Sequence, residues 1–203
     1  MRIRDEFYIE GEKMIKDIYR EMEKESGKKF PERKIVLGFG NENAAIMLIG
    51  EAPGAQEEKE GKPFVGSAGK NLDEFIERLE IKREDIFISN TVKIRPFKLS
   101  EKTGNKVNRP PNDEELEFFI PYLKREIEVL KPKFIVTLGN TALRAVTGDN
   151  KAVIGEKHAR EIQIGESVLF PLYHPASVIY NRKLKDTYYE DLEKLKMIFH
   201  CKG

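Results

Sequence analysis

Three polar residues stand where short apolar runs end, and their side chains could carry hydrolytic chemistry. Glu51 follows the first of four such runs, Asn90 ends the second and His174 ends the fourth. A carboxylate can hold and deprotonate water, a carboxamide can meet a donor beside an acceptor, and an imidazole can donate a hydrogen bond to developing charge. The sequence therefore predicts that polar side chains able to do chemistry lie at the ends of buried segments.

The four runs and the segments between them predict the fold that positions these residues. Each run is apolar almost throughout, as a strand buried on both faces requires, and helical periodicity separates one run from the next. Ligands gather at the carboxyl ends of strands in open parallel sheets, so the four strand ends should meet at one cleft. We predict one domain over residues 1–203, an α/β fold of three layers, α/β/α, with a central four-stranded parallel sheet. The predicted strands are residues 45–50, 86–90, 134–139 and 168–174, and the predicted helices are 69–79, 113–130, 140–147 and 184–199, after an N-terminal helix and a polar join near 25–34.

Positive charge is concentrated in two segments, although the whole chain of 203 residues carries a formal charge of only +1. Six lysines and arginines against Glu101 give residues 92–109 a charge of +5, and a second cluster at 182–185 adds +3. Concentrated positive charge suits a phosphate backbone, while solvated loops of a lysine-rich and glutamate-rich surface are the alternative interpretation. The basic residues are Lys93, Arg95, Lys98, Lys102, Lys106 and Arg109 in the first segment, and Arg182, Lys183 and Lys185 in the second.

Cysteine usage and hydropathy limit the other classes of protein. Cys201 is the single cysteine, which excludes an internal disulfide and any site that needs several cysteines. The first residues are charged throughout and no stretch approaches about 18 consecutive apolar residues, so neither a secretory leader nor a membrane span is predicted. We expect a cytoplasmic monomer with no membrane partner.

Three motifs at successive strand ends carry a resemblance to a known family. They are GEAPGAQEEKEGKPFVGSAG at residues 50–69, SNTVK at 89–93 and HPASV at 174–178. In this order they resemble the uracil-DNA glycosylase superfamily, from about Val36 to the C-terminus, and most closely its thermophilic and bacterial branch that carries an iron–sulfur cluster. The resemblance implies a DNA repair enzyme that flips uracil out of DNA and hydrolyses its N-glycosidic bond, leaving an abasic site.

The sequence departs from that branch in its cluster ligands. The cluster needs four cysteines, but Ile94 and Phe119 stand where two of them are expected, and the N-terminal pair is absent. We therefore predict no iron–sulfur cluster, no other metal and no cofactor, with apolar packing in the cluster's place.

The residue at position 108 bears on the catalytic cycle. A histidine replaces Asn108 in a branch that bonds covalently to its product, so we expect this enzyme to release its product and act on further substrate. No lysine is expected to attack the sugar, which makes the enzyme monofunctional.

The resemblance implies roles for the residues of a uracil pocket. Phe64 would stack on the flipped ring, and the alternative is an ordinary core phenylalanine. The Asn90 oxygen would accept a hydrogen bond from uracil N3–H, and its NH2 group would donate one to O4. Cytosine has the opposite pattern of donor and acceptor at these two positions. The alternative is that Asn90 caps the turn after the strand. His174 would donate a hydrogen bond to uracil O2 as negative charge develops there.

The attacking water and the exclusion of thymine involve the loop after the first strand. Glu51 is the candidate for placing or activating water, with backbone carbonyls as the alternative, because Ala52 stands where the best-known branch has an aspartate. Ala52 is therefore placed in the uracil pocket. Glu57 is the candidate for blocking the 5-methyl group of thymine, because Gly54 stands where that branch has a tyrosine.

The remaining predicted residues would bind DNA outside the pocket. Backbone N–H groups at the start of a helix, beside a lysine, form a natural phosphate site, although a plain helix cap is nearly as good an interpretation. The family places an apolar wedge after the HP dipeptide, where Val178 matches best. The basic loop at 96–107, longer than the usual form, would add phosphate contacts. The predicted DNA-binding residues are Ser67, Gly69, Lys70, Asn108, Arg109, Val178, Ile179 and Arg182.

Three rival functions remain open at the level of the sequence. Superfamily members share a fold and differ in pocket details, so a glycosylase for hypoxanthine or xanthine is the first rival. A non-catalytic DNA-binding protein of the same fold is the second, although Glu51, Asn90 and His174 together argue against it. A nucleotide-binding α/β domain is the weakest, because the chain has neither a GxGxxG motif nor a P-loop.

Overall fold

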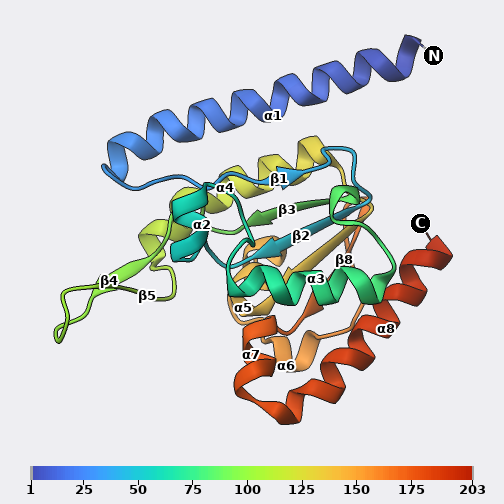
Figure 1. Cartoon of the computed structure of the whole chain (residues 1–203). Helices are drawn as coiled ribbons and strands as arrows, with labels where there is room; N and C mark the ends of the chain where they lie inside the picture. The colour runs from blue at the N-terminus through green and yellow to red at the C-terminus, as the bar shows by residue number, and fades with distance from the viewer. Residues whose placement is uncertain (1, 203) are drawn as a thin grey trace.

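A mixed six-stranded sheet forms the centre of the protein in a computed structural model (Figure 1). The structure describes the backbone of residues 2–202, and the side chains of residues 2–13, 67, 68, 71, 179, 180, 182 and 202 lie outside the described part. The strand order is β1-β3-β2-β6-β8-β7. The strands are β1 (Phe39–Gly40), β2 (Ile46–Gly50), β3 (Ile86–Asn90), β6 (Phe134–Leu138), β7 (Ile162–Ile164) and β8 (Ser167–Leu172).

The sheet differs from the predicted four-stranded parallel one at its edges. The four predicted strands are present as the parallel centre β3-β2-β6-β8, and every residue of β2, β3 and β6 is buried. Two antiparallel edge strands, β1 and β7, were not predicted. They have two and three residues and none of these is buried, so neither leaves the apolar run that identified the others.

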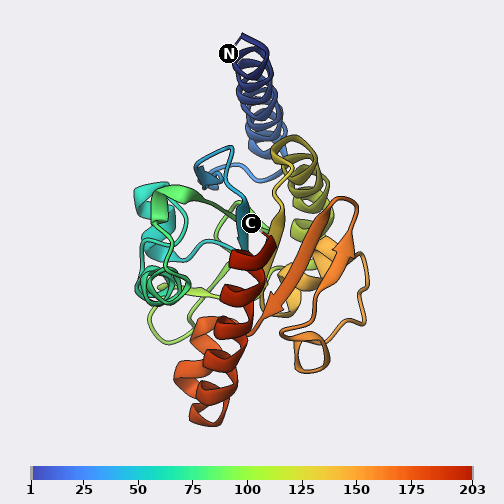
Figure 2. The ribbon, with the colours of Figure 1, turned by 90° about the vertical axis from the view of Figure 1, so that its right-hand side faces the viewer.

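Helices cover both faces of the sheet, so the predicted three layers are present (Figure 2). On one face Leu48 and its neighbours pack against α3 (Ser67–Leu79) and α8 (Lys185–Lys202). On the other face Met47 and Ile49 pack against α4 (Asp113–Leu130) and α5 (Gly139–Thr147). Because side chains alternate along a strand, β2 supplies both layers of the core.

Two elements lie outside the three layers. Helix α1 (Arg2–Lys29) packs against α4 and runs into the join predicted near 25–34, ending just before Pro31. A hairpin of β4 (Phe97–Leu99) and β5 (Lys106–Asn108) projects from the body, where an irregular basic loop was predicted (Figure 1). Within residues 2–202 no helix is both long enough and apolar enough to cross a bilayer.

Short elements complete the carboxyl edge of the sheet. Helix α2 (Ala55–Glu60) follows β2, and α6 (Ile154–Lys157) follows α5. Helix α7 (Pro175–Tyr180) follows β8 and begins with His174 as its cap. The 3₁₀ helix Arg182–Leu184 follows α7, whereas the 3₁₀ helix Arg83–Asp85 lies at the opposite edge, directly before β3.

Candidate functional site

A cavity of about 780 Å³ opens at the carboxyl ends of β2, β3, β6 and β8. The four strand ends therefore meet at one cleft, as the strand pattern predicts. Its lining includes most of the predicted pocket residues, and Thr141 and Tyr173 besides. The predicted residues that line it are Glu51, Ala52, Glu57, Phe64, Asn90, Asn108 and His174.

Gly50 allows Asn90 and Phe64 to approach each other at the wall of the cavity. A Cβ atom at Gly50 would lie 2.5 Å from Asn90 Oδ1 and 2.7 Å from Phe64 Cζ, closer than real Cβ atoms come to other atoms. Phe64 has a left-handed backbone (φ 54°), and its ring also packs in the core beside α3. The ring therefore has one edge in the core and one at the cavity, so the two interpretations of Phe64 are compatible.

The Asn90 side chain is buried but free to bind a ligand. Only 3% of the residue is exposed, and among the described residues no protein group hydrogen-bonds its carboxamide. Its backbone is held instead, because Lys93 Nζ donates to Asn90 O at 2.6 Å. The next residue, Thr91, donates through both its backbone N–H and its hydroxyl to Gly50 O, at 2.9 and 3.0 Å. Because Asn90 lines the cavity and its amide atoms are not fully covered by protein, the carboxamide is open to a ligand that enters there.

A fully buried ion pair lies behind Asn90. Lys93 Nζ donates to Glu126 Oε2 at 2.8 Å and to Ser89 Oγ at 2.7 Å, and both charged side chains are 0% exposed. With Asn90 O as third acceptor, all three ammonium hydrogens are used. Burial lowers the pKa of Lys93, and the adjacent Glu126 carboxylate counteracts part of that shift. We name Ser89, Lys93 and Glu126 the ionic cluster.

The ionic cluster corrects the charge map drawn from the sequence. Lys93 and Arg95 were counted in the basic segment 92–109, but both are buried. Lys93 is neutralised by Glu126, and Arg95 Nη1 pairs with Glu58 Oε2 at 3.2 Å. Their partners lie elsewhere in the chain, so a count of charges along the sequence could not detect them. The exposed positive charge of this segment is therefore confined to the hairpin.

Glu57 joins two loops at the mouth of the cavity. Its carboxylate accepts the backbone N–H of Gly54 at 3.1 Å and that of Gly66 at 2.8 Å. A Cβ at Gly54 would lie 2.7 Å from Glu57 Oε2, so a tyrosine could not stand at position 54 without displacing this carboxylate. The predicted role in excluding thymine stays a prediction, to which the structure adds a role in fixing the two loops.

Thr141 orients the carboxylate of Glu51. The Thr141 hydroxyl, on the first turn of α5, donates to Glu51 Oε2 at 2.5 Å. This bond leaves Oε1 for water, as general-base catalysis requires. Thr141 had no predicted role, although its position directly after a strand end was a signal that could have identified it.

His174 is held as a neutral hydrogen-bond donor. Its Nδ1 accepts the backbone N–H of Ala176 at 3.2 Å, which assigns the ring proton to Nε2. Burial lowers the pKa of His174, and the Glu51 carboxylate counteracts part of that effect. A neutral ring with its Nε2–H free is the form that can donate to a ligand oxygen.

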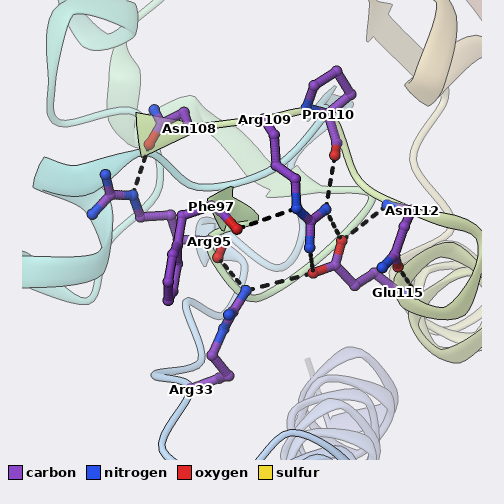
Figure 3. Close-up of polar contacts among 8 residues, drawn as sticks. All are labelled: Arg33, Arg95, Phe97, Asn108, Arg109, Pro110, Asn112 and Glu115. Carbon is purple, nitrogen blue, oxygen red and sulfur yellow. Dashed lines mark hydrogen bonds and ion pairs between the residues drawn. The ribbon is translucent and has the colours of Figure 1, made fainter. Parts of the chain in front are cut away.

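Arg109 is part of a clamp at the root of the hairpin (Figure 3). Its guanidinium makes two bonds to Glu115, at 2.7 and 2.8 Å, and donates to Phe97 O and Pro110 O. Burial alone would raise the pKa of Glu115, but its bonds with Arg109 and Asn112 outweigh this and lower it. Arg109 is therefore occupied within the protein, and the contacts favour a positioning role over its predicted phosphate contact.

The other predicted DNA-binding residues lie at different distances from the cavity. Asn108 lines it, and Arg95 Nε donates to Asn108 Oδ1 at 2.7 Å. Gly69 is buried, and a Cβ there would lie 2.4 Å from Phe64 O, so this glycine serves close packing. Lys70 is exposed on α3, and Val178 on α7 is half-buried against the core. The predictions for Ser67, Ile179 and Arg182 fall on side chains outside the described part.

The region where an iron–sulfur cluster would bind is filled by apolar side chains. Ile94 and Phe119 are both 0% exposed and belong to one buried cluster between α1 and α4. Phe119 contacts Phe30 and Phe118, with ring centroids 5.8 and 4.8 Å away. We name Phe30, Ile94, Phe118 and Phe119 the aromatic cluster. With Cys201 exposed on α8, these residues do not fit an iron–sulfur group.

Comparison with known proteins relates this cavity to one family. The model of the uracil DNA glycosylase superfamily matches residues 37–195. The type-4 uracil-DNA glycosylase of Sulfurisphaera tokodaii is 40% identical over 169 residues, which is 79% of this chain and 73% of that protein. That of Thermotoga maritima is 36% identical over 172 residues (83% and 85%), and that of Archaeoglobus fulgidus is 34% identical over 172 residues (79% of each).

Proposed function

Because the chain belongs to the uracil-DNA glycosylase superfamily, we propose that it excises uracil from DNA by hydrolysis and leaves an abasic site. The observation that carries the proposal is the Asn90 carboxamide, buried at the cavity and without a protein partner among the described residues. A uracil ring offers the N3–H donor and O4 acceptor that such an amide lacks. Cytosine would leave both of these buried groups unpaired, at a cost of about 1–3 kcal/mol each.

The geometry supports a mechanism in which each side chain has one task. The flipped base lies against the Phe64 ring, with Asn90 on its N3 and O4 edge. Glu51 takes a proton from water as the water oxygen bonds to C1′ of the sugar. The C1′–N1 bond breaks, its electron pair leaves with uracil, and Nε2–H of His174 donates to the negative charge at O2.

Lys93, which is hydrogen-bonded to the backbone of Asn90, supports the simple hydrolytic product. Lys93 is fully buried, and acceptors occupy all three of its ammonium hydrogens. Among the described residues no lysine lines the cavity, so no amine is available to form a Schiff base. We propose an intact abasic strand as the product. We also propose that the enzyme is a cytoplasmic monomer.

Base selectivity of Asn90 variants tests the proposal. Asn90→Ala should lower uracil excision about 5-fold to 150-fold, the equivalent of about 1–3 kcal/mol. Asn90→Asp should lose uracil excision and gain weak activity on cytosine, because a protonated carboxyl can donate to cytosine N3 while accepting from N4. Asn43→Asp, in an exposed loop, is the matched control.

Single-turnover rates on oligonucleotides with one uracil, cytosine, hypoxanthine or xanthine give the comparison. If wild-type protein excises hypoxanthine or xanthine faster than uracil, the function is that of a glycosylase for another deaminated base. If both Asn90 variants remain folded and excise uracil at the wild-type rate, Asn90 does not recognise the base.

A further inference from the structure

The hairpin of β4 and β5 is the part of the molecule that the proposed chemistry does not use. It projects beyond the body, and every residue from 101 to 108 is exposed (Figure 1). Its root nevertheless adjoins the cavity, because Asn108, the last residue of β5, belongs to the lining. A ligand that enters the cavity as part of a long polymer would therefore pass beside the hairpin.

The root of the hairpin is tied to the body from both strands. Arg95 Nη2 donates to Lys106 O at 3.1 Å. Arg109 Nε donates to Phe97 O at 3.2 Å (Figure 3). The Phe97 ring lies between two cations, with Arg33 Cζ 4.2 Å and Lys106 Nζ 4.3 Å from its centroid. Cations over an aromatic face are attracted to it, so the root holds a set direction relative to the cavity.

The outer part of the hairpin is closed by its own turn. Gly104 N donates to Ser100 O at 2.8 Å, and Ser100 N donates to Asn105 O at 2.9 Å. Gly104 has φ 67°, a left-handed backbone that favours glycine. The hairpin is thus a defined two-stranded ribbon.

Both faces of the ribbon combine positive charge with apolar surface. Lys98 lies opposite Val107, and Leu99 lies opposite Lys106. Leu99 is 63% exposed and Val107 45% exposed. Within the described part of the chain no carboxylate pairs with Lys98, Lys102 or Lys106. Exposed apolar residues beside free cations are typical of an interaction surface for a polyanion that also offers apolar contacts.

We propose that this hairpin is an arm that lies in a groove of duplex DNA flanking the target nucleotide. The inference rests on the proposed function for the identity of the polymer. A two-stranded ribbon fits the major groove, which is about 12 Å wide. There the lysines of both faces reach the phosphates of the two strands, and Leu99 and Val107 lie against the groove. The arm binds the duplex around the target and takes no part in the chemical step.

Binding of uracil-free DNA tests the arm without requiring excision. The variant Lys98→Gln/Lys102→Gln/Lys106→Gln is compared with Lys24→Gln/Lys124→Gln/Lys133→Gln, which removes the same charge from exposed sites elsewhere. Fluorescence anisotropy measures the binding constant for a duplex and for one of its single strands at several salt concentrations. The slope of log K against the logarithm of salt concentration is then compared between variants. For the duplex, the slope of the arm variant should fall by about 1 for each lysine removed. The salt slope of the control variant should equal that of the wild-type protein. The arm variant should lose less affinity for the single strand than for the duplex.

Further readouts separate this proposal from the proposed function. Single-turnover excision at saturating DNA should be unchanged in the arm variant. The proposal of an arm is wrong if the arm variant has the same salt slope for duplex binding as the control variant. It is also wrong if the arm variant loses as much affinity for the single strand as for the duplex. Both outcomes would hold even if wild-type protein excises uracil. A selective loss of duplex binding would support the arm even if no base were excised.

The apolar pair is tested separately. Leu99→Ser/Val107→Ser should weaken duplex binding several-fold without changing the salt slope. If sedimentation instead shows that this variant converts a dimer to a monomer while duplex binding is unchanged, the hairpin is an interface between two copies and the arm is wrong.

Discussion

The ionic cluster and the aromatic cluster lie on the same secondary-structure elements. The first consists of charged and polar side chains, and the second consists of apolar ones. Both pack the segment that leaves β3 against α4, where Phe119 and Glu126 lie seven residues apart on one stripe of the helix. The aromatic cluster is joined by stacked and edge-to-face ring contacts, and none of these contacts is a hydrogen bond. The ionic cluster is joined by hydrogen bonds, and one of them ends on Asn90 O. Apolar packing thus stabilises this region, and the ion pair holds the backbone of Asn90.

Removal of the buried ammonium should have the largest effect. Lys93→Met leaves Glu126 buried without its cation, so unfolding free energy should fall by about 3–5 kcal/mol. Lys93→Met/Glu126→Leu removes both charges and should recover most of that stability, as urea unfolding would measure. Its uracil excision should stay below wild type, because Asn90 O still lacks its donor. A double variant with full activity would show that the ionic cluster does not position Asn90.

Truncation in the aromatic cluster should affect stability alone. Phe119→Ala removes a fully buried ring and should lower the unfolding free energy by about 3–5 kcal/mol. Well below its melting temperature the variant should keep the wild-type ratio of uracil to cytosine excision, because no bond from this cluster reaches Asn90. A changed ratio in single-turnover assays would abolish the distinction between the two clusters.

Metal removal should have the smallest effect, because the aromatic cluster fills the region of the iron–sulfur ligands. Protein produced with added iron should be colourless, and dialysis against a chelator should leave both melting temperature and excision rate unchanged. Stoichiometric iron in the purified protein, or a melting temperature that falls on chelation, would contradict this expectation.

The sequence predicted those parts of the fold whose burial leaves a pattern in the chain. The four central strands and the helices α3, α4 and α5 between them were predicted because each is apolar in runs or at helical spacing. The short helices α2 and α6 between these strands were not predicted. Strands β1 and β7 have two and three residues without a buried position, and the exposed strands of the hairpin were interpreted as a loop. Such short strands form because they pair with a neighbouring strand. The sequence of the short strand alone does not show which strand that neighbour is.

The same limit applies to the site. Glu51, Asn90 and His174 were predicted because strand ends in a parallel sheet converge, and the cavity brings them together. The burial of Lys93 was missed because its partner Glu126 lies 33 residues away on α4. Likewise the partner of Arg109 was not evident, although Glu115 is only six residues away, because the turn at residues 110–112 before α4 brings the two side chains together.

Protonation of His174 at Nδ1 and the side-chain cap of α7 are mutually exclusive. The Nδ1 lone pair that accepts the Ala176 amide hydrogen is the same one that a proton would occupy. A proton can bind Nδ1 only if the hydrogen bond from the Ala176 N–H breaks. Protonation therefore costs the free energy of that cap bond, about 0.5–2 kcal/mol for a helix cap. Since burial also lowers the pKa of His174, acid is the condition that charges the ring, and helix α7 would loosen at its start as it does so. His174 thus links proton uptake to local unfolding beside the cavity.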